Sequence, residues 1–216
     1  MDNNYIFQYW EAIQDGTVTV GKWIKTIYEI LVNGLKSGKW DFDEEKANKA
    51  INFIENFCHH SEGRNDLLKL ELWQKAIVSA IFGIMDKRTG YRQFREVFIV
   101  VARKNGKTFF AAAIAAYMTY VDGEYGAKVY FLAPKLDQAD LVYDAFYQIV
   151  QADDELDSIT KKRRSDIYIK EFNTSVKKIA FNSKKSDGFN PQMVVNDEME
   201  AWQGDQGLKQ YEVMTS

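Results

Sequence analysis

Apolar residues recur at helical spacing through the first ninety residues of the chain. The first stripe runs from Tyr5 to Ile13, with members four residues apart that fall on one face of a helix. A second stripe runs from Val20 to Leu35, and we expect Gly34 and Gly38 to end that helix. Both stripes are typical of amphipathic helices that pack their apolar faces together.

Two more helices are expected before residue 90. Asp41 or Asp43 is a suitable N-cap for a helix that runs towards His59, and residues 70–84 form the next apolar stripe. We therefore expect a helical N-terminal appendage over residues 1–66.

The pattern changes near residue 90, where short β-branched runs begin to alternate with helical stripes. This order predicts a mainly parallel sheet flanked by helices, with ligands at the carboxyl ends of its strands. The expected strands are Glu96–Val101, Lys128–Leu132, a hairpin of Ile167–Ile169 with Val176–Phe181, and Met193–Val195; the expected helices are Lys107–Tyr120 and Asp137–Val150. The residues at 97–101 and 193–195 are continuously apolar, which is typical of strands covered on both faces.

Composition excludes several classes of protein. The 216 residues are 46% hydrophobic and 27% charged, with two prolines, which is the balance of a globular protein rather than a disordered one. No apolar run is long enough to span a membrane. A single cysteine, Cys58, excludes an internal disulfide. The net charge is −3, yet residues 161–185 carry nine Lys or Arg and two acidic side chains, which makes this segment a candidate phosphate contact or a solvated hairpin face.

A phosphate-binding turn is expected between the strand that ends at Val101 and the helix that begins at Lys107. Gly106-Lys-Thr108 is the second half of the Walker A pattern, although Val101 stands where its first glycine belongs. Backbone N–H groups of such a turn cradle phosphate, the lysine reaches the β- and γ-phosphates, and the hydroxyl of Thr108 binds Mg²⁺.

Two carboxylates follow the last expected strand. Asp197 and Glu198 come directly after the apolar run that ends at Val195 and Asn196. In phosphoryl transfer, an aspartate at a strand end holds the Mg²⁺ shell and a neighbouring glutamate polarises the attacking water. Together with the phosphate turn, the pair predicts an ATPase.

Four segments together resemble the ATPase portion of the large terminase subunit of tailed bacteriophages, the DNA-packaging motor. The resemblance covers about residues 68–216, and its R-K-N-G-K-T and N-D-E combination is specific. In this family the first Walker A glycine is typically absent and an arginine follows the strand, which accounts for Val101. The matching segments are Leu72-Trp-Gln74 with Ile81-Phe-Gly83, Ala102–Thr108, Phe131–Pro134 with Gln138-Ala139, and Asp187-Gly188 with Pro191, Val194–Glu198 and Ala201-Trp202.

The resemblance implies a role for each matching residue. Gln74 would contact adenine and Arg103 would sense or stabilise the γ-phosphate, while Asp197 and Thr108 would bind Mg²⁺ and Glu198 would activate water. The ATP-binding set would be Gln74, Arg103, Lys104, Asn105, Gly106, Lys107 and Thr108. The alternative for Gln74 is a solvated helix residue.

The resemblance also implies the fold, the function and the partners. We expect a P-loop α/β domain of the ASCE type over residues 67–216, which binds ATP and Mg²⁺ and drives double-stranded DNA into a procapsid. The expected partners are DNA, the portal of the procapsid, the small terminase subunit and further copies in a ring, with no membrane, in the cytoplasm of the infected bacterium. A complete large terminase also carries an endonuclease domain, and nothing in this sequence supplies its acidic cluster.

Two other functions stay open at this point: a helicase-like nucleic-acid translocase, and an adaptor that binds nucleotide without hydrolysing it. Arg163 and Arg164 are candidates for an arginine acting in trans on a neighbouring subunit, or for DNA contacts. Cys58, His59 and His60 are adjacent, but neighbouring residues of a helix point in different directions, so we interpret them as structural or surface residues rather than as metal ligands.

Overall fold

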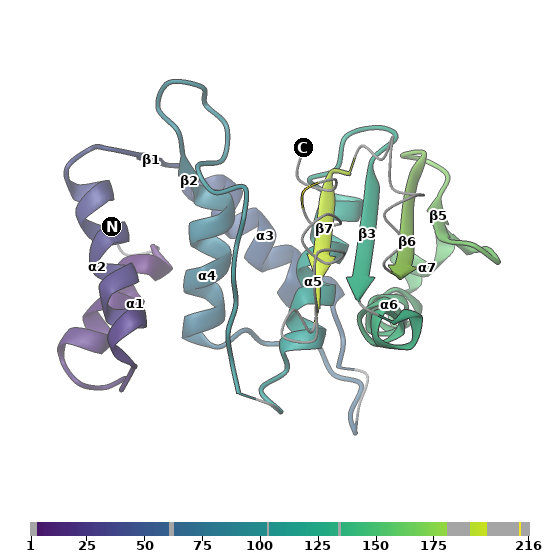
Figure 1. The fold of residues 1–216 in the computed structure, drawn as a ribbon, viewed down its shortest axis with the longest axis horizontal. Helices are drawn as coiled ribbons and strands as arrows, with labels where there is room; N and C mark the ends of the chain where they lie inside the picture. Colours follow the sequence, from purple (N-terminus) through teal and green to yellow (C-terminus); the bar gives the residue numbers. More distant parts are fainter. Residues whose placement is uncertain are drawn as a thin grey trace. The chain divides into compact units, whose positions relative to one another are not determined.

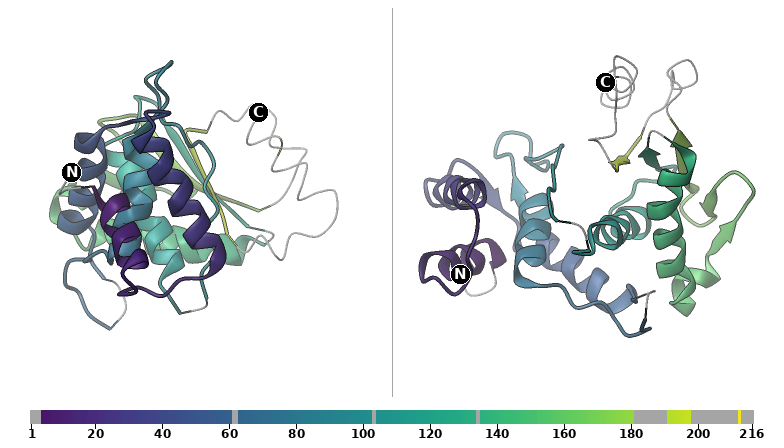
Figure 2. Two further views of the ribbon diagram at one scale, coloured as in Figure 1. Left: turned by 90° about the vertical axis from the view of Figure 1, so that its left-hand side faces the viewer. Right: turned by 60° about the horizontal axis from the view of Figure 1, so that its bottom comes forward.

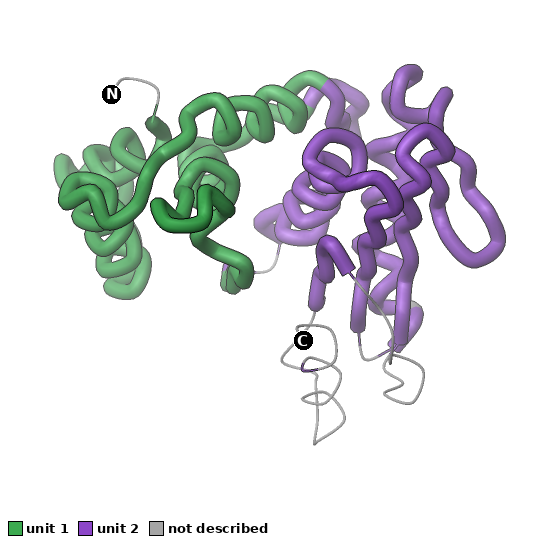
Figure 3. The backbone as a smooth tube through the Cα atoms, turned by 90° about the horizontal axis from the view of Figure 1, so that it is seen from above, with its two compact units in different colours: residues 1–56, 68–100 green, residues 57–67, 101–216 purple. Residues whose placement is uncertain are grey.

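The computed structural model describes residues 4–60, 63–102, 104–133, 135–180, 191–197 and 212. These residues gather into two units, Met1–Asn56 with Leu68–Val100 and Phe57–Leu67 with Val101–Ser216 (Figure 3). This grouping joins residues 68–100 to the N-terminal helices, whereas the expected domain boundary lies between residues 66 and 67. The domain boundary between residues 66 and 67 stays a prediction.

Among its described residues, the first unit has four helices at the expected places (Figure 1). They are α1 (Tyr5–Gln14), α2 (Lys22–Lys36), α3 (Glu44–Phe57) and α4 (Leu72–Gly83). The side chain of Asn4 caps α1 by accepting the N–H of Ile6, and Asp43 caps α3 by accepting the N–H of Lys46. Asp43, rather than Asp41, is therefore the N-cap of α3.

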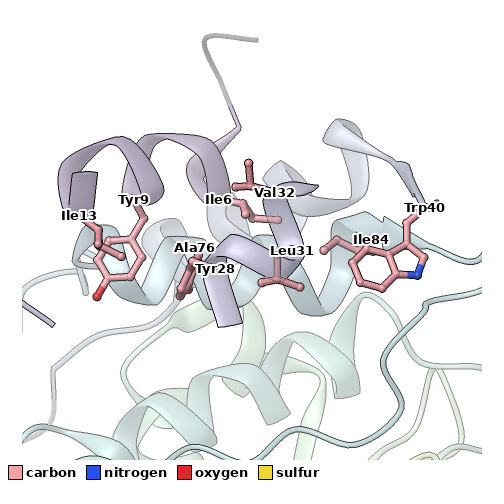
Figure 4. Packing of buried hydrophobic residues seen from close by; sticks show 9 residues of the cluster. All are labelled: Ile6, Tyr9, Ile13, Tyr28, Leu31, Val32, Trp40, Ala76 and Ile84. Atoms are coloured by element: carbon pink, nitrogen blue, oxygen red, sulfur yellow. The ribbon is translucent and has the colours of Figure 1, made fainter. Parts of the chain in front are cut away.

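Apolar faces of α1, α2 and α4 meet in one core cluster (Figure 4). Ile6 is fully buried, and the rings of Tyr9 and Tyr28 meet edge to face with centroids 4.7 Å apart. A short antiparallel pair, β1 (Asp41–Phe42) with β2 (Ile84–Met85), follows α2 and α4 along the chain. Each large side chain buried here contributes about 1.5–3 kcal/mol, so packing of these faces accounts for most of the stability of the helices.

Gly34 does not end α2 as expected, because the helix continues through it to Lys36. A Cβ on Gly34 would lie 2.4 Å from the ring of Trp40, so the residue is a glycine to let that ring pack on the helix. Gly38, with φ +69°, follows the end of the helix in the left-handed conformation, which is the usual role of a terminating glycine.

In the described part of the second unit, five strands form a mixed sheet that is accompanied by helices. Its strands are β4 (Thr160–Lys162), β5 (Ile167–Ile169), β6 (Thr174–Ala180), β3 (Lys128–Ala133) and β7 (Met193–Asn196), in that spatial order. β3 pairs in parallel with β6 and β7, whereas β5 pairs antiparallel with β4 and β6. The parallel core and the β5–β6 hairpin are as expected, and β4 was not anticipated.

The described helices that accompany this sheet are α5 (Lys107–Tyr120), α6 (Leu136–Gln151) and the short α7 (Asp154–Ser158). α5 and α6 pack against each other, and they also contact β7 and the β3–β6 pair respectively (Figure 2). The alanine-rich centre of α5 is buried. Its small side chains allow neighbouring helices and strands to approach the helix closely.

The expected strand Glu96–Val101 is not formed, which corrects the sequence-based interpretation. A strand requires a hydrogen-bonded neighbour, and no described strand pairs with these residues. Phe98 is 66% exposed and Val100 is 92% exposed, so the segment is not covered on both faces. β7 likewise pairs only with β3 among the described strands, and its residues are half-buried rather than buried.

None of the helices in the described part of the chain is long and apolar enough to cross a membrane.

Candidate functional site

The turn before α5 contains two described residues in the left-handed backbone conformation. Lys104 and Gly106 adopt left-handed conformations, with φ of 66° and 69°, and Asn105 Nδ2 donates to the carbonyl of Ala102 at 3.1 Å. Left-handed residues in a turn can direct successive N–H groups to one side, which creates an anion-binding concavity. Arg103 lies outside the described residues, so its expected role stays a prediction.

Gly106 is the N-cap of α5 and has no side chain to cover the end of the helix. The first intrahelical bond runs from the N–H of Phe110 to the carbonyl of Gly106 at 2.9 Å. The N–H groups of Lys107, Thr108 and Phe109 therefore precede the first acceptor within the helix, and they carry the positive end of its dipole. Such a helix end favours phosphate.

Asp197 lies directly after β7, at the carboxyl end of the parallel strands. Its N–H donates to the carbonyl of Leu132 on β3 at 3.1 Å, which fixes the backbone as the strand ends. Its side chain is 13% exposed, and Oδ1 lies 3.3 Å from Nζ of Lys107. The structure thus brings the two sequence motifs together through one ion pair. Glu198 lies outside the described residues.

Gln74 lies in the other unit, in the first turn of α4. Its side chain is buried and its Oε1 accepts the N–H of Glu71 at 2.9 Å, while the Glu71 side chain accepts a backbone N–H of the same turn. Gln74 is therefore buried and caps its own helix, so the alternative interpretation of a solvated helix residue is wrong. An adenine contact by Gln74 stays a prediction.

Arg163 and Arg164 differ in their surroundings. Arg163 donates from Nε and Nη2 to both carboxylate oxygens of Asp166, each at 2.6 Å, and its guanidinium lies 4.0 Å from the ring of Tyr168. These hydrogen bonds from Arg163 lower the pKa of Asp166. Arg164 is exposed. Arg163 therefore has a structural role in its own hairpin, and a trans-acting or DNA-contacting role for either arginine stays a prediction.

The Cys58–His60 segment has structural contacts. Cys58 is fully buried, which raises the pKa of its thiol. His59 Nδ1 lies 3.2 Å from the carbonyl of Asn65. His60 instead stacks on Phe109, the residue after Thr108, a neighbourhood that the sequence did not reveal because 49 residues separate the two rings. In the described part of the chain, no group of three or more His, Cys, Asp or Glu side chains is placed to hold a metal ion.

Comparisons with known proteins bear on the family and the fold of this chain. The model of a family described as the terminase large subunit ATPase domain matches residues 72–215. Among solved structures, the large terminase of bacteriophage HK97 is similar, with a TM-score of 0.66 and 23% identity, over 79% of this chain and 35% of that chain. This likeness supports the P-loop α/β fold, and the chain spans about a third of the HK97 protein. A search of curated proteins finds no match.

Proposed function

Because this chain belongs to the terminase large subunit ATPase-domain family, we propose that it binds and hydrolyses ATP as the motor that packages viral DNA. One observation carries the proposal: the ion pair between Lys107, at the start of α5, and Asp197, at the end of β7. A P-loop ATPase uses a lysine at the start of this helix to bind the β- and γ-phosphates and an aspartate at a strand end to hold their magnesium ion.

Lys107 has a compact ammonium group that can bridge the β- and γ-phosphates. Before nucleotide binds, its charge is balanced by Asp197 at 3.3 Å. The phosphates of a bound triphosphate would compete for the same ammonium group. Their binding would release the carboxylate of Asp197 from Lys107 and leave it free to hold a magnesium ion. The turn over Lys104, Asn105 and Gly106 would supply backbone N–H groups to the phosphates.

The residues present fit a magnesium ion. Thr108 offers a hydroxyl and Asp197 a carboxylate, and oxygen ligands of this kind suit Mg²⁺, which keeps several waters and binds through few protein groups. The bond from the Asp197 N–H to Leu132 holds this carboxylate at the strand end. A magnesium ion held by these two residues would neutralise charge on the phosphates.

Other roles in the proposal rest on the motifs. Glu198 would polarise the attacking water, Arg103 would stabilise the γ-phosphate, and Gln74 would contact adenine. In the working motor, Arg163 or Arg164 would act on a neighbouring copy or on DNA. The partners would be double-stranded DNA, the portal of the procapsid and the small terminase subunit, in the cytoplasm of the infected host.

Calorimetry with Mg-ATP tests the proposal. We expect the parent chain to bind, and we expect Lys107→Ala and Asp197→Ala to bind at least tenfold more weakly, because each loses a charged contact. A folded parent that binds no nucleotide contradicts the proposal. Binding of Mg-ATP without phosphate release, measured in the presence of DNA, favours the adaptor over the motor.

A further inference from the structure

His60 and Phe109 form an aromatic pair beside the phosphate turn. Their ring centroids are 5.9 Å apart and their planes differ by 12°, which is a stacked arrangement. Phe109 is the third residue of α5 and follows Thr108 directly. Both rings are half-buried, and both residues belong to the unit that contains Lys107 and Asp197.

His60 is held in place by its own loop. Its N–H donates to the carbonyl of Asp66 at 2.9 Å, and His59 pairs with Leu67 to close the loop. Nη2 of Arg64 lies 2.5 Å from Nε2 of His60, and because a guanidinium only donates, Nε2 is the acceptor. Nε of Arg64 in turn lies 3.2 Å from the carboxylate of Asp66. The imidazole is therefore oriented before any ligand arrives.

The stereochemistry of a nucleotide extends this observation. A phosphate chain bound over the first turn of α5 leaves its ribose and base close to that turn, because only the ribose separates the α-phosphate from the base. Aromatic faces bind nucleobases by stacking. We propose that His60 and Phe109 form the wall against which the base of the bound nucleotide packs; this inference rests on the proposed ATPase function.

The pair differs from Gln74 as a base contact. The Oε1 atom of Gln74 already accepts a backbone N–H in a helix cap, and the residue belongs to the other unit. The polarisable faces of His60 and Phe109 need no hydrogen-bond partner to contact a base. A stacking wall also tolerates different bases, so this pair would contribute affinity rather than a strict choice of adenine.

Comparing Mg-ATP with inorganic tripolyphosphate separates the base from the phosphates. We expect His60→Ala and Phe109→Leu to lower the affinity of the chain for ATP about tenfold while its affinity for tripolyphosphate is unchanged. Phe109→Tyr keeps the ring and should retain the affinity for ATP. His59→Ala is the matched control, because its imidazole contacts the Asn65 carbonyl, and it should change neither affinity.

The outcomes are distinguishable. Equal losses for both ligands would show that the pair acts only through the shape of the turn, and would overturn the inference. Unchanged affinities in both ring-removing variants, with folding confirmed by circular dichroism, would also overturn it. If the parent binds tripolyphosphate as tightly as ATP, the base contributes nothing to affinity. That result overturns the inference but not the proposed phosphate site. A parent that binds neither ligand overturns the proposed function, and the inference with it.

Discussion

Nζ of Lys107 lies 3.3 Å from Oδ1 of Asp197, although ninety residues separate them in the sequence. The lysine is one-third exposed and the aspartate is 13% exposed, so the contact is only partly screened by water. It joins the first turn of α5 to the end of β7. Each partner is positioned by its own element, and nucleotide and metal are the ligands that would separate the two charges.

The ion pair between Lys107 and Asp197 predicts that alanine substitutions of the two residues differ in how their effect on ATP binding depends on Mg²⁺. Lys107→Ala should weaken ATP binding about tenfold to a hundredfold with or without Mg²⁺, because the phosphates lose a cation. Asp197→Ala should weaken binding only with Mg²⁺; in EDTA its affinity should equal or exceed that of the parent, since a competing anion has gone. Calorimetry in both buffers measures this.

Asp140→Ala is the control for that experiment. Asp140 forms an ion pair with Lys178 in the same unit, and its removal should leave ATP affinity unchanged in both buffers. If Asp197→Ala and Asp140→Ala behave alike, Asp197 is not a magnesium ligand.

Gly106 adopts φ +69° at the N-terminus of α5, a conformation that costs a side-chain-bearing residue about 1 kcal/mol. Gly106→Ala should lower the free energy of unfolding by that amount and also weaken tripolyphosphate binding, because the turn shifts. Gly90→Ala is matched, with φ +71° and open space around the position, and should lower stability without affecting binding. Urea unfolding and calorimetry give the two readouts. Equal binding by both variants would show that the turn does not hold phosphate.

Asp166 is expected to make stability depend on pH. Arg163 lowers the pKa of this buried carboxyl in the folded state, so the pair stabilises the fold at pH values above the unfolded pKa of about 4 and loses its effect as the pH falls through the folded value. Asp166→Asn should cost about 1–2 kcal/mol at pH 7 and progressively less below pH 4. Thermal melts across this range measure the difference.

Arg164→Ala serves as the comparison for the hairpin, because Arg164 is exposed and should leave stability unchanged at either pH. A difference between parent and Asp166→Asn that is the same at pH 3 and pH 7 would exclude the charge of Asp166 as its cause.

Gly34→Ala should destabilise the first unit, contrary to the usual preference of helices for alanine. The new Cβ would lie 2.4 Å from the Trp40 ring, and overpacking should exceed the gain of about 1 kcal/mol in helix propensity, for a net loss of about 1–2 kcal/mol. Asn33→Ala, one residue earlier and exposed, should be neutral or slightly stabilising. Urea unfolding of both variants tests the sign. A stabilising Gly34→Ala would mean that the ring is not packed on α2.

The apolar residues Val97, Phe98 and Val100, which are exposed, predict self-association. Phe98→Ser and Val100→Ser should change the free energy of unfolding by less than about 0.5 kcal/mol, yet reduce light scattering at high concentration, since exposed strand-forming segments pair with other chains. Phe110→Ala, at a buried position, should cost about 3–5 kcal/mol for contrast. A large loss of stability at Phe98 or Val100 would show that the segment is covered in solution.

Much of the local structure was determined by the sequence alone. The stripes predicted the helices from α1 to α6 to within a few residues, because helix periodicity and caps are local properties of the chain. The turn from Lys104 to Gly106 and the carboxylate of Asp197 were recognisable from residue type and spacing. The β5–β6 hairpin was recognisable from its short β-branched runs.

Only the tertiary structure decided which groups meet. Strand pairing depends on a neighbour elsewhere in the chain, so the sequence could not show that residues 96–101 have no described partner, or that β7 pairs only with β3. Likewise, no local pattern reveals that the Trp40 ring packs on Gly34, that Arg163 donates hydrogen bonds to Asp166, or that His60 stacks on Phe109. These contacts join residues that are distant along the chain or whose mutual orientation depends on packing. Packing is a property of the whole fold.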